Sequence, residues 1–264
     1  MGWSLGFSSD VGPAGRLDAV LVCGGVWHDF DYARLQLLDA LASREQVRTR
    51  VYENYDCLDA LSAADLLVTF TCDVRPDTSQ QRALLDFVSR GGRWLALHGT
   101  NAAIEPPPPG GERIFSTPRV LGDVAALLGS QFLGHPPIAP YEVQIAQPDH
   151  PLVCDVQPFM VTDELYISEL HGPLDVVLHT HFNGTCRGFV EGAVHDDEPR
   201  PVLYLRRHGD GEVCYFTLGH CRGRYDMQSM GVDDLGVTDR GSWVVPEFRT
   251  VLDRCITWGV GSNS

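Results

Sequence analysis

The chain has 264 residues, of which 44% are hydrophobic, and its formal net charge is −15. All 20 basic residues are arginine, and the absence of lysine excludes mechanisms that need a Schiff-base, P-loop or general-base lysine. The negative charge argues against a nucleic-acid partner or an anionic membrane surface. No apolar run approaches the roughly 18 residues that span a membrane, and the first residues lack the basic and apolar regions of a secretory signal. We therefore expect a globular cytoplasmic protein that binds neither nucleic acid nor membrane.

The first hundred residues alternate between strand and helix patterns. Residues 1–16 are rich in Gly and Ser and are expected to form a flexible arm. Apolar runs predict strands at 17–23, 47–52, 64–70 and 93–97, the second of them nearer a sheet edge. A helix capped by Asp29 or Asp31 follows the first strand, and the spacing from Asp77 to Gln80 is typical of a capping box that begins another helix, ending at Gly91. The side chains expected to face the core are Leu35, Leu38 and Leu41 of the first helix and Leu84, Leu85, Phe87 and Val88 of the second.

The second half of the chain is richer in strand patterns. Residues 106–111 predict a stiff surface loop that forms a rim over the strand ends, and a short helix is expected at 120–128. Strand-like runs at 141–145, 175–179 and 201–206 predict an antiparallel, β-rich extension, and a buried strand at 212–218 ends before Gly219-His220. Pro246 begins the last helix. The whole pattern predicts an α/β fold with a doubly wound, mostly parallel sheet, in a single domain from 17 to 264.

The eight cysteines give no sign of a metal or disulfide framework. They never form a C-x-x-C motif, and most lie within apolar strand or helix patterns. We therefore expect buried free thiols of a reducing compartment.

Three histidines follow predicted strands. His28 comes after the first strand, His98 ends the fourth, and His220 ends the late strand. Because the carboxyl ends of parallel strands share one edge of a sheet, where ligands usually bind, the three imidazoles are expected to converge. Converging neutral imidazoles suit Zn²⁺ or another divalent metal, or a proton-transfer site. The alternative is that each histidine caps a strand and bonds a backbone carbonyl. For His98 we expect a ring that faces the cleft and contributes little to the core.

The segment Asp163-Glu164-Leu165-Tyr166 holds further candidates. Adjacent carboxylates on a strand point to opposite faces, so at most one of Asp163 and Glu164 is expected to face the site, with Glu164 and Tyr166 on one side. Such a pair, near a histidine, suits the binding of sugar hydroxyls or proton movement between sugar carbons. The alternative is a capping or ion-pairing motif in a loop.

Seven short motifs occur in an order that resembles the ThuA-like (trehalose-utilisation) family over about residues 17–260. The resemblance implies a fold related to class I glutamine amidotransferases, which is flavodoxin-like, and a role in the catabolism of trehalose, related disaccharides or their 3-keto forms. The sequence departs from the family in the 106–111 loop and at Glu212, where an Arg is common. The motifs are His28-Asp29-Phe30, the Gly91–Gly99 run, Phe132-Leu133-Gly134-His135-Pro136, Asp149-His150-Pro151-Leu152, Asp163-Glu164-Leu165-Tyr166, Gly209-Asp210-Gly211 with Val213-Cys214-Tyr215, and Leu218-Gly219-His220.

The resemblance also bears on the role of His98. In amidotransferases of this fold a cysteine nucleophile occupies the turn that here holds His98, so glutaminase activity is not expected. The predicted partner is a small-molecule sugar, and the sequence leaves open a homo-oligomer. The protein is expected to be an enzyme (a hydrolase, lyase or isomerase), and the alternative is a sugar-binding or regulatory protein without catalysis. The expected roles are catalysis for His98, Glu164 and His220, substrate binding for His28, His135, Asp163 and Tyr166, and zinc or other divalent metal binding for His28, His98 and His220.

Overall fold

A nine-stranded sheet forms the centre of the chain in the computed structural model, which describes residues 15–108, 112 and 114–261. The strand order is β2-β1-β3-β4-β11-β10-β9-β6-β7. The five strands from β2 to β11 pair in parallel, and the remaining pairs are antiparallel. The strands are β1 (Leu17–Gly25), β2 (Val47–Tyr52), β3 (Leu66–Cys72), β4 (Arg93–Leu97), β6 (Ala139–Ile145), β7 (Phe159–Asp163), β9 (Asp175–Thr180), β10 (Arg200–His208) and β11 (Gly211–Phe216).

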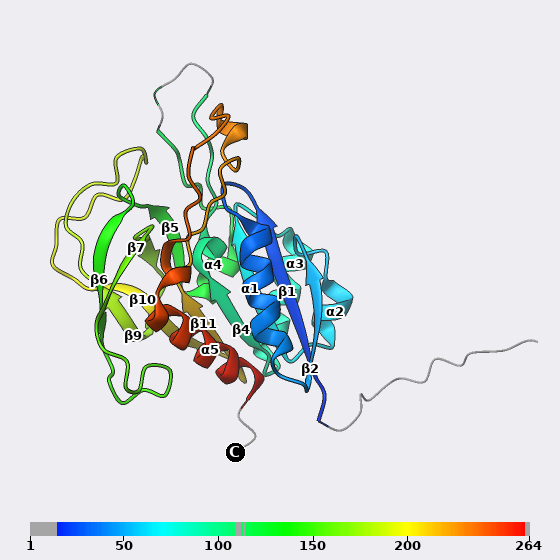
Figure 1. Cartoon of the computed structure of the whole chain (residues 1–264). Coiled ribbons are helices and arrows are strands. Elements are labelled where there is room, and N and C mark those ends of the chain that lie inside the picture. The colour runs from blue at the N-terminus through cyan, green and yellow to red at the C-terminus, as the bar shows by residue number, and fades with distance from the viewer. Residues whose placement is uncertain (1–14, 109–111, 113, 262–264) are drawn as a thin grey trace, which may run out of the picture.

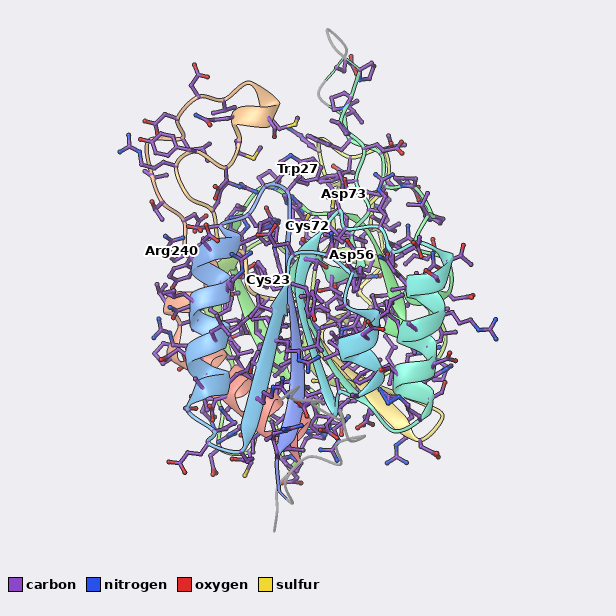
Figure 2. All side chains as sticks on the ribbon, turned by 90° about the vertical axis from the view of Figure 1, so that its right-hand side faces the viewer. Cys23, Trp27, Asp56, Cys72, Asp73 and Arg240 are labelled. Carbon is purple, nitrogen blue, oxygen red and sulfur yellow. The ribbon has the colours of Figure 1, made fainter. Side chains whose placement is uncertain are left out.

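Helices cover both faces of the parallel half (Figure 1). Helices α1 (Phe30–Ala42) and α5 (Pro246–Val260) bury their apolar residues in one core cluster, and α2 (Leu58–Ser62), α3 (Thr78–Ser89) and α4 (Asp123–Leu128) bury theirs in another. Figure 2 shows α1 and α3 on opposite sides of the strands. Two short strands, β5 (Ser130–Gly134) and β8 (Ile167–Leu170), form a separate antiparallel pair. The chain is thus a mixed α/β protein with a large central sheet, parallel in one half and extended by antiparallel strands, as the sequence predicts.

Local predictions hold where side-chain chemistry fixes the geometry. Asp29 caps α1 by accepting from the Tyr32 N–H at 3.0 Å, and Asp77 and Gln80 form the expected capping box of α3. The edge position of β2 is confirmed. All eight cysteines are free, and all except Cys154 are buried. No helix in the described part of the chain is long and apolar enough to cross a membrane.

Other predictions are wrong in detail. The buried face of α1 consists of Ala33, Leu37 and Leu41, whereas Leu35 is 65% exposed, because positions four apart share a helix face and position 35 lies off that row. Leu38 and Leu85 are half-buried and pack against the two core clusters, so the expectation that they face the core holds. Helix α4 begins at Asp123, three residues later than expected. Residues 1–14 of the expected arm and 109–111 of the expected rim loop lie outside the described residues.

Candidate metal and substrate site

Three histidines and one glutamate converge at the carboxyl edge of the parallel strands. His98 directly follows β4, His28 and His220 lie just beyond β1 and β11, and Glu164 directly follows β7. One side-chain ligand atom from each of the four lies within 4.8 Å of those of the others, and all four residues are buried. Figure 2 places Trp27 and Cys72, which border this site, at the same end of the strands. The parallel sheet therefore brings together the three imidazoles, as the sequence predicts.

Backbone strain accompanies this convergence. Trp27 and His98 adopt positive φ angles of 69° and 45°, in the left-handed region that non-glycine residues rarely occupy. For His98 the strained turn directs the imidazole at the end of β4 toward His28, and its ring stacks on Phe70 with centroids 5.9 Å apart. Strain of this kind persists where the surrounding structure enforces it, and it is concentrated at functional sites.

The hydrogen bonds of His28 and His98 fix which ring nitrogens carry protons. His28 Nδ1 lies 3.2 Å from the Val26 carbonyl oxygen, and His98 Nδ1 lies 2.9 Å from that of Thr217. Because a carbonyl oxygen only accepts, both Nδ1 atoms are donors, and in the neutral rings both Nε2 atoms are bare. Yet the two Nε2 atoms are only 2.9 Å apart. Two lone pairs at this distance repel each other unless a proton or a metal ion lies between them.

Three further distances approach those of a tetrahedral metal site, and the four ligand atoms all lie within 4.8 Å of one another. Glu164 Oε2 lies 3.4 Å from His98 Nε2 and 3.6 Å from His28 Nε2, and Glu164 Oε1 lies 3.2 Å from His220 Nδ1. Zinc bonds of about 2.0–2.1 Å imply ligand-to-ligand edges of roughly 3.3 Å in a tetrahedron. Both buried ring nitrogens of His220 face a carboxylate oxygen, Nδ1 that of Glu164 and Nε2 that of Asp239 at 3.4 Å. The donor set and its spacing fit Zn²⁺ or a similar divalent cation.

The charges within the cluster are strongly coupled. Burial lowers the pKa of His28 to about 3, and the neighbouring His98 and His220 add to this effect. Burial alone would raise the pKa of Glu164, but His220 and His135 hold it well below its usual range. Burial also opposes protonation of His220, yet Glu164 and Asp239 raise its pKa to about 10. Without metal, Glu164 is therefore a carboxylate beside a charged His220 and a neutral His28.

A cavity of about 270 Å³ opens above the cluster. His28 and Glu164 reach its floor, whereas His98 and His220 lie beneath it, since neither borders the cavity. Around this floor stand His135, Tyr166 and Arg222, and the remaining wall is mostly aromatic and aliphatic. The Tyr166 hydroxyl lies 3.4 Å from His98 Nε2. The arrangement places a small-molecule pocket directly over a candidate metal ligand set.

Comparison with known proteins identifies the family. The family model described as ThuA, trehalose utilisation, matches residues 19–231. The chain belongs to the ThuA family. Its membership, expected from the motifs, supports a protein of sugar catabolism. No curated protein matches the chain in sequence.

Several solved structures resemble this chain in fold although their sequences are only 12–14% identical to it. A ThuA-like protein from Bacteroides uniformis is 12% identical, with 97% of this chain and 96% of that chain covered and a TM-score of 0.64. A ThuA-like protein from Parabacteroides merdae is 14% identical, with 93% and 90% covered and a TM-score of 0.58. A β-galactosidase from Rahnella sp. R3 is 12% identical over 92% of this chain and 31% of its own, with a TM-score of 0.53. At such identities the likeness concerns the fold.

Asp163, which the sequence suggested as a substrate-binding residue, lies away from the cavity and accepts hydrogen bonds from the backbone. Its buried carboxylate accepts from the N–H groups of Glu164 (2.8 Å), Gly219 (3.2 Å), His220 (3.2 Å) and Ser242 (3.0 Å), and from the Ser242 hydroxyl. It does not border the cavity. Asp163 instead fixes the backbone of Glu164 and His220.

The expectation that the His98 ring contributes little to the core is also wrong. His98 is 1% exposed, and its ring packs between those of Phe70 and Tyr166. The alternative considered from sequence, a histidine bonded to a backbone carbonyl, holds for Nδ1, while Nε2 faces the cluster. In His98, therefore, Nδ1 holds the ring in place through the Thr217 carbonyl, and Nε2 is directed at the cluster.

Two further residues of the site were missed. Arg222 donates to the Trp27 carbonyl oxygen at 2.9 Å and to Glu164 Oε1 at 3.1 Å. Asp239 Oδ2 lies 3.4 Å from His220 Nε2, the position of a carboxylate that orients a metal-binding histidine. Asp239 lies in an irregular loop that pairs with Arg222 through two backbone hydrogen bonds. Such a loop has no periodic pattern, so the sequence gives no signal for this contact.

Proposed function

We propose that this ThuA-family protein is a metal-dependent enzyme that acts on a disaccharide or a 3-keto-sugar, as a hydrolase, lyase or isomerase. The observation that carries the proposal is the pair of bare Nε2 atoms of His28 and His98, 2.9 Å apart and beside the Glu164 carboxylate. Such a donor set suits a metal cation, and its position under a cavity would give that cation access to a ligand. The metal would be Zn²⁺ or a similar ion held by His28, His98, Glu164 and His220.

Each side chain has a definable part in this proposal. A divalent ion held by these four residues would act as a Lewis acid toward a carbonyl or hydroxyl oxygen of the substrate, which would bind it as an additional ligand. His135 donates from Nδ1 to the Pro136 carbonyl oxygen at 2.8 Å, so its Nε2 is free to take up a proton, and it borders the cavity 3.7 Å from Glu164 Oε1. The Tyr166 hydroxyl also borders the cavity and is placed to bond a sugar oxygen. His98 and His220, beneath the floor, hold the ion rather than touch the sugar.

The non-catalytic alternative explains these features less well. A pocket that only binds a sugar needs amides, hydroxyls and aromatic rings, and it gains nothing from burying three imidazoles around a carboxylate. Buried ionisable groups cost stability unless they are paired or metal-bound. Their concentration at the cavity floor therefore favours chemistry there.

The likeness to amidotransferases lies in the fold and does not extend to glutamine hydrolysis. Strands β2-β1-β3-β4, with helices on both faces, support the inference of a doubly wound, flavodoxin-like and amidotransferase-like arrangement. At the turn after β4, where those enzymes carry a nucleophilic cysteine, this chain has His98, which cannot form a thioester. The strained φ of His98 suits such a turn.

The test compares metal-stripped protein with protein reconstituted with Zn²⁺, Mn²⁺ or Co²⁺. We expect turnover of 3-keto-trehalose or a 3-keto-glucoside with metal, and a loss of about 10²-fold or more without it or in Glu164→Gln. Glu45→Gln, the same substitution at an exposed position, is the matched control. Equal turnover by metal-stripped and reconstituted protein would reject the metal-dependent mechanism.

A further inference from the structure

The wall of the cavity is a continuous series of aromatic rings. Neighbouring rings lie close enough to contact edge to face or in tilted stacks. The series ends at Tyr166, whose ring centroid is 4.7 Å from that of His98. Along it the centroid distances are 6.1 Å from Trp27 to Phe115, 5.8 Å from Phe115 to Phe189, 5.4 Å from Phe189 to Phe132 and 4.4 Å from Phe132 to Tyr166.

Two irregular segments hold this wall in place. The Phe115 N–H donates to the Gly188 carbonyl oxygen at 2.7 Å, and the Val190 N–H donates to the Phe115 carbonyl oxygen at 2.9 Å. Phe189 packs so closely on β5 that a Cβ at Gly134 would lie 2.9 Å from its Cγ. The rings are therefore a preformed surface, and a flat ligand does not need to order them.

One wall of the cavity is mostly apolar, although polar side chains occur both at the floor and nearer the solvent. The floor carries the buried groups His28 and Glu164, with Arg222 beside them already committed to the Trp27 carbonyl and to Glu164. The half-buried outer wall includes Phe115, Ile138, Phe189 and Met227, side chains with no N–H or O–H group and no charge. Of the wall's ionic groups, the exposed Arg187 makes no side-chain hydrogen bond or ion pair with the residues that the structure describes.

The apolar wall discriminates between ligands. A cavity of about 270 Å³ is at the small end for ligand sites. One sugar ring at the floor would find hydrogen-bond partners and the metal. A second sugar ring against the apolar wall would find few donors besides Arg187 and the Trp27 indole N–H, and each hydroxyl that loses water without replacement is unfavourable. A planar apolar ring there would stack on the wall and leave nothing unpaired.

We propose that the part of the cavity beside the aromatic wall is an aglycone subsite for a planar aromatic group, so that aryl glycosides are preferred over disaccharides among the ligands of the proposed function. The sugar end of this assignment rests on the proposed function, since it places the glycone over the metal ligands. The aromatic end rests on the ring series from Trp27 to Phe132.

The test measures binding by calorimetry to the zinc-loaded protein, with both anomers of phenyl glucoside and with trehalose. We expect the better phenyl glucoside to bind at least about tenfold more tightly than trehalose. Phe189→Ala should reduce that preference to about twofold or less, and Phe115→Ala should do the same if the first variant does not fold. Phe182→Ala is the matched control, because Phe182 lies in the same segment and core cluster as Phe189 but does not border the cavity.

Three results would overturn the subsite: trehalose binding as tightly as phenyl glucoside, Phe189→Ala weakening both ligands equally, or neither ligand binding at millimolar concentration. Turnover of the corresponding 3-keto-glycosides is measured separately. Preferential aryl binding without any turnover would reject the proposed enzyme activity and leave the subsite intact, so the two failures are distinguishable.

Discussion

Asp163→Asn is the substitution that best tests how the site is held. The carboxylate accepts from four backbone N–H groups and one hydroxyl, all in buried surroundings. The amide of the same shape keeps one acceptor oxygen. Because the His220 N–H contacts both carboxylate oxygens, at least one donor, the Glu164 N–H, loses its partner. At about 2 kcal/mol for an unsatisfied buried donor, the loss is at least about 2 kcal/mol of unfolding free energy. For a chain of this size that corresponds to a melting temperature lower by at least about 4–8 °C.

The assay is thermal unfolding followed by circular dichroism, with zinc affinity measured on the same samples. Because Asp163 anchors the backbone of both Glu164 and His220, zinc affinity should fall about 10- to 100-fold, as for other residues that orient metal ligands. Asp197→Asn, at an exposed position, is the control. An Asp163→Asn protein that melts within 2 °C of the unaltered protein (roughly 1 kcal/mol or less) and binds zinc equally well would refute this role.

The remaining predictions concern pH, turnover and glutamine. Burial opposes protonation of His220, but Glu164 and Asp239 raise its pKa to about 10. The positive charge of His220 therefore stabilises the metal-free protein fully below about pH 6.5, and this contribution is lost as the pH rises through 10. Zinc affinity, measured against a chelator, should rise over the same interval because zinc displaces that proton, and a pH-independent affinity would contradict the assignment. His98→Ala should abolish turnover and also lower the melting temperature, since the buried ring packs on Phe70 and pairs the Thr217 carbonyl; activity retained per folded molecule would end its assignment as a metal ligand. Purified protein should release no ammonia from glutamine, and thiol-dependent release would show that another cysteine replaces the missing nucleophile.

The parts of the site that follow from sheet geometry could be predicted from the sequence. His28, His98 and His220 each follow an apolar run, and parallel pairing of β1, β3, β4 and β11 places the ends of those runs together. The alternation of side chains on a strand likewise predicts that only one of Asp163 and Glu164 faces the site. The sequence does not say which, because that depends on the pairing of β7 with β6 and on the turn that follows.

Features built by irregular segments could not be predicted. The backbone bonds between Phe115 and the 188–190 segment join residues more than 70 positions apart, and neither segment has a periodic pattern. Asp239 reaches His220 through a loop closed by its backbone bonds to Arg222. The error at Leu35 has a simpler cause: a leucine-rich helix offers more than one apolar row, and the row that faces the sheet is decided by packing of small Ala33 beside Leu37 and Leu41.

The central claim is that His28, His98, Glu164 and His220 hold one divalent cation beneath the cavity. Anomalous diffraction at the zinc absorption edge, on crystals of the reconstituted protein, tests it most directly. We expect a single strong peak within bonding distance of His28 Nε2, His98 Nε2 and a Glu164 oxygen, at about 2.0–2.2 Å, with His220 completing the set. A map without a peak at this place, or with zinc bound only by other residues, would contradict the account.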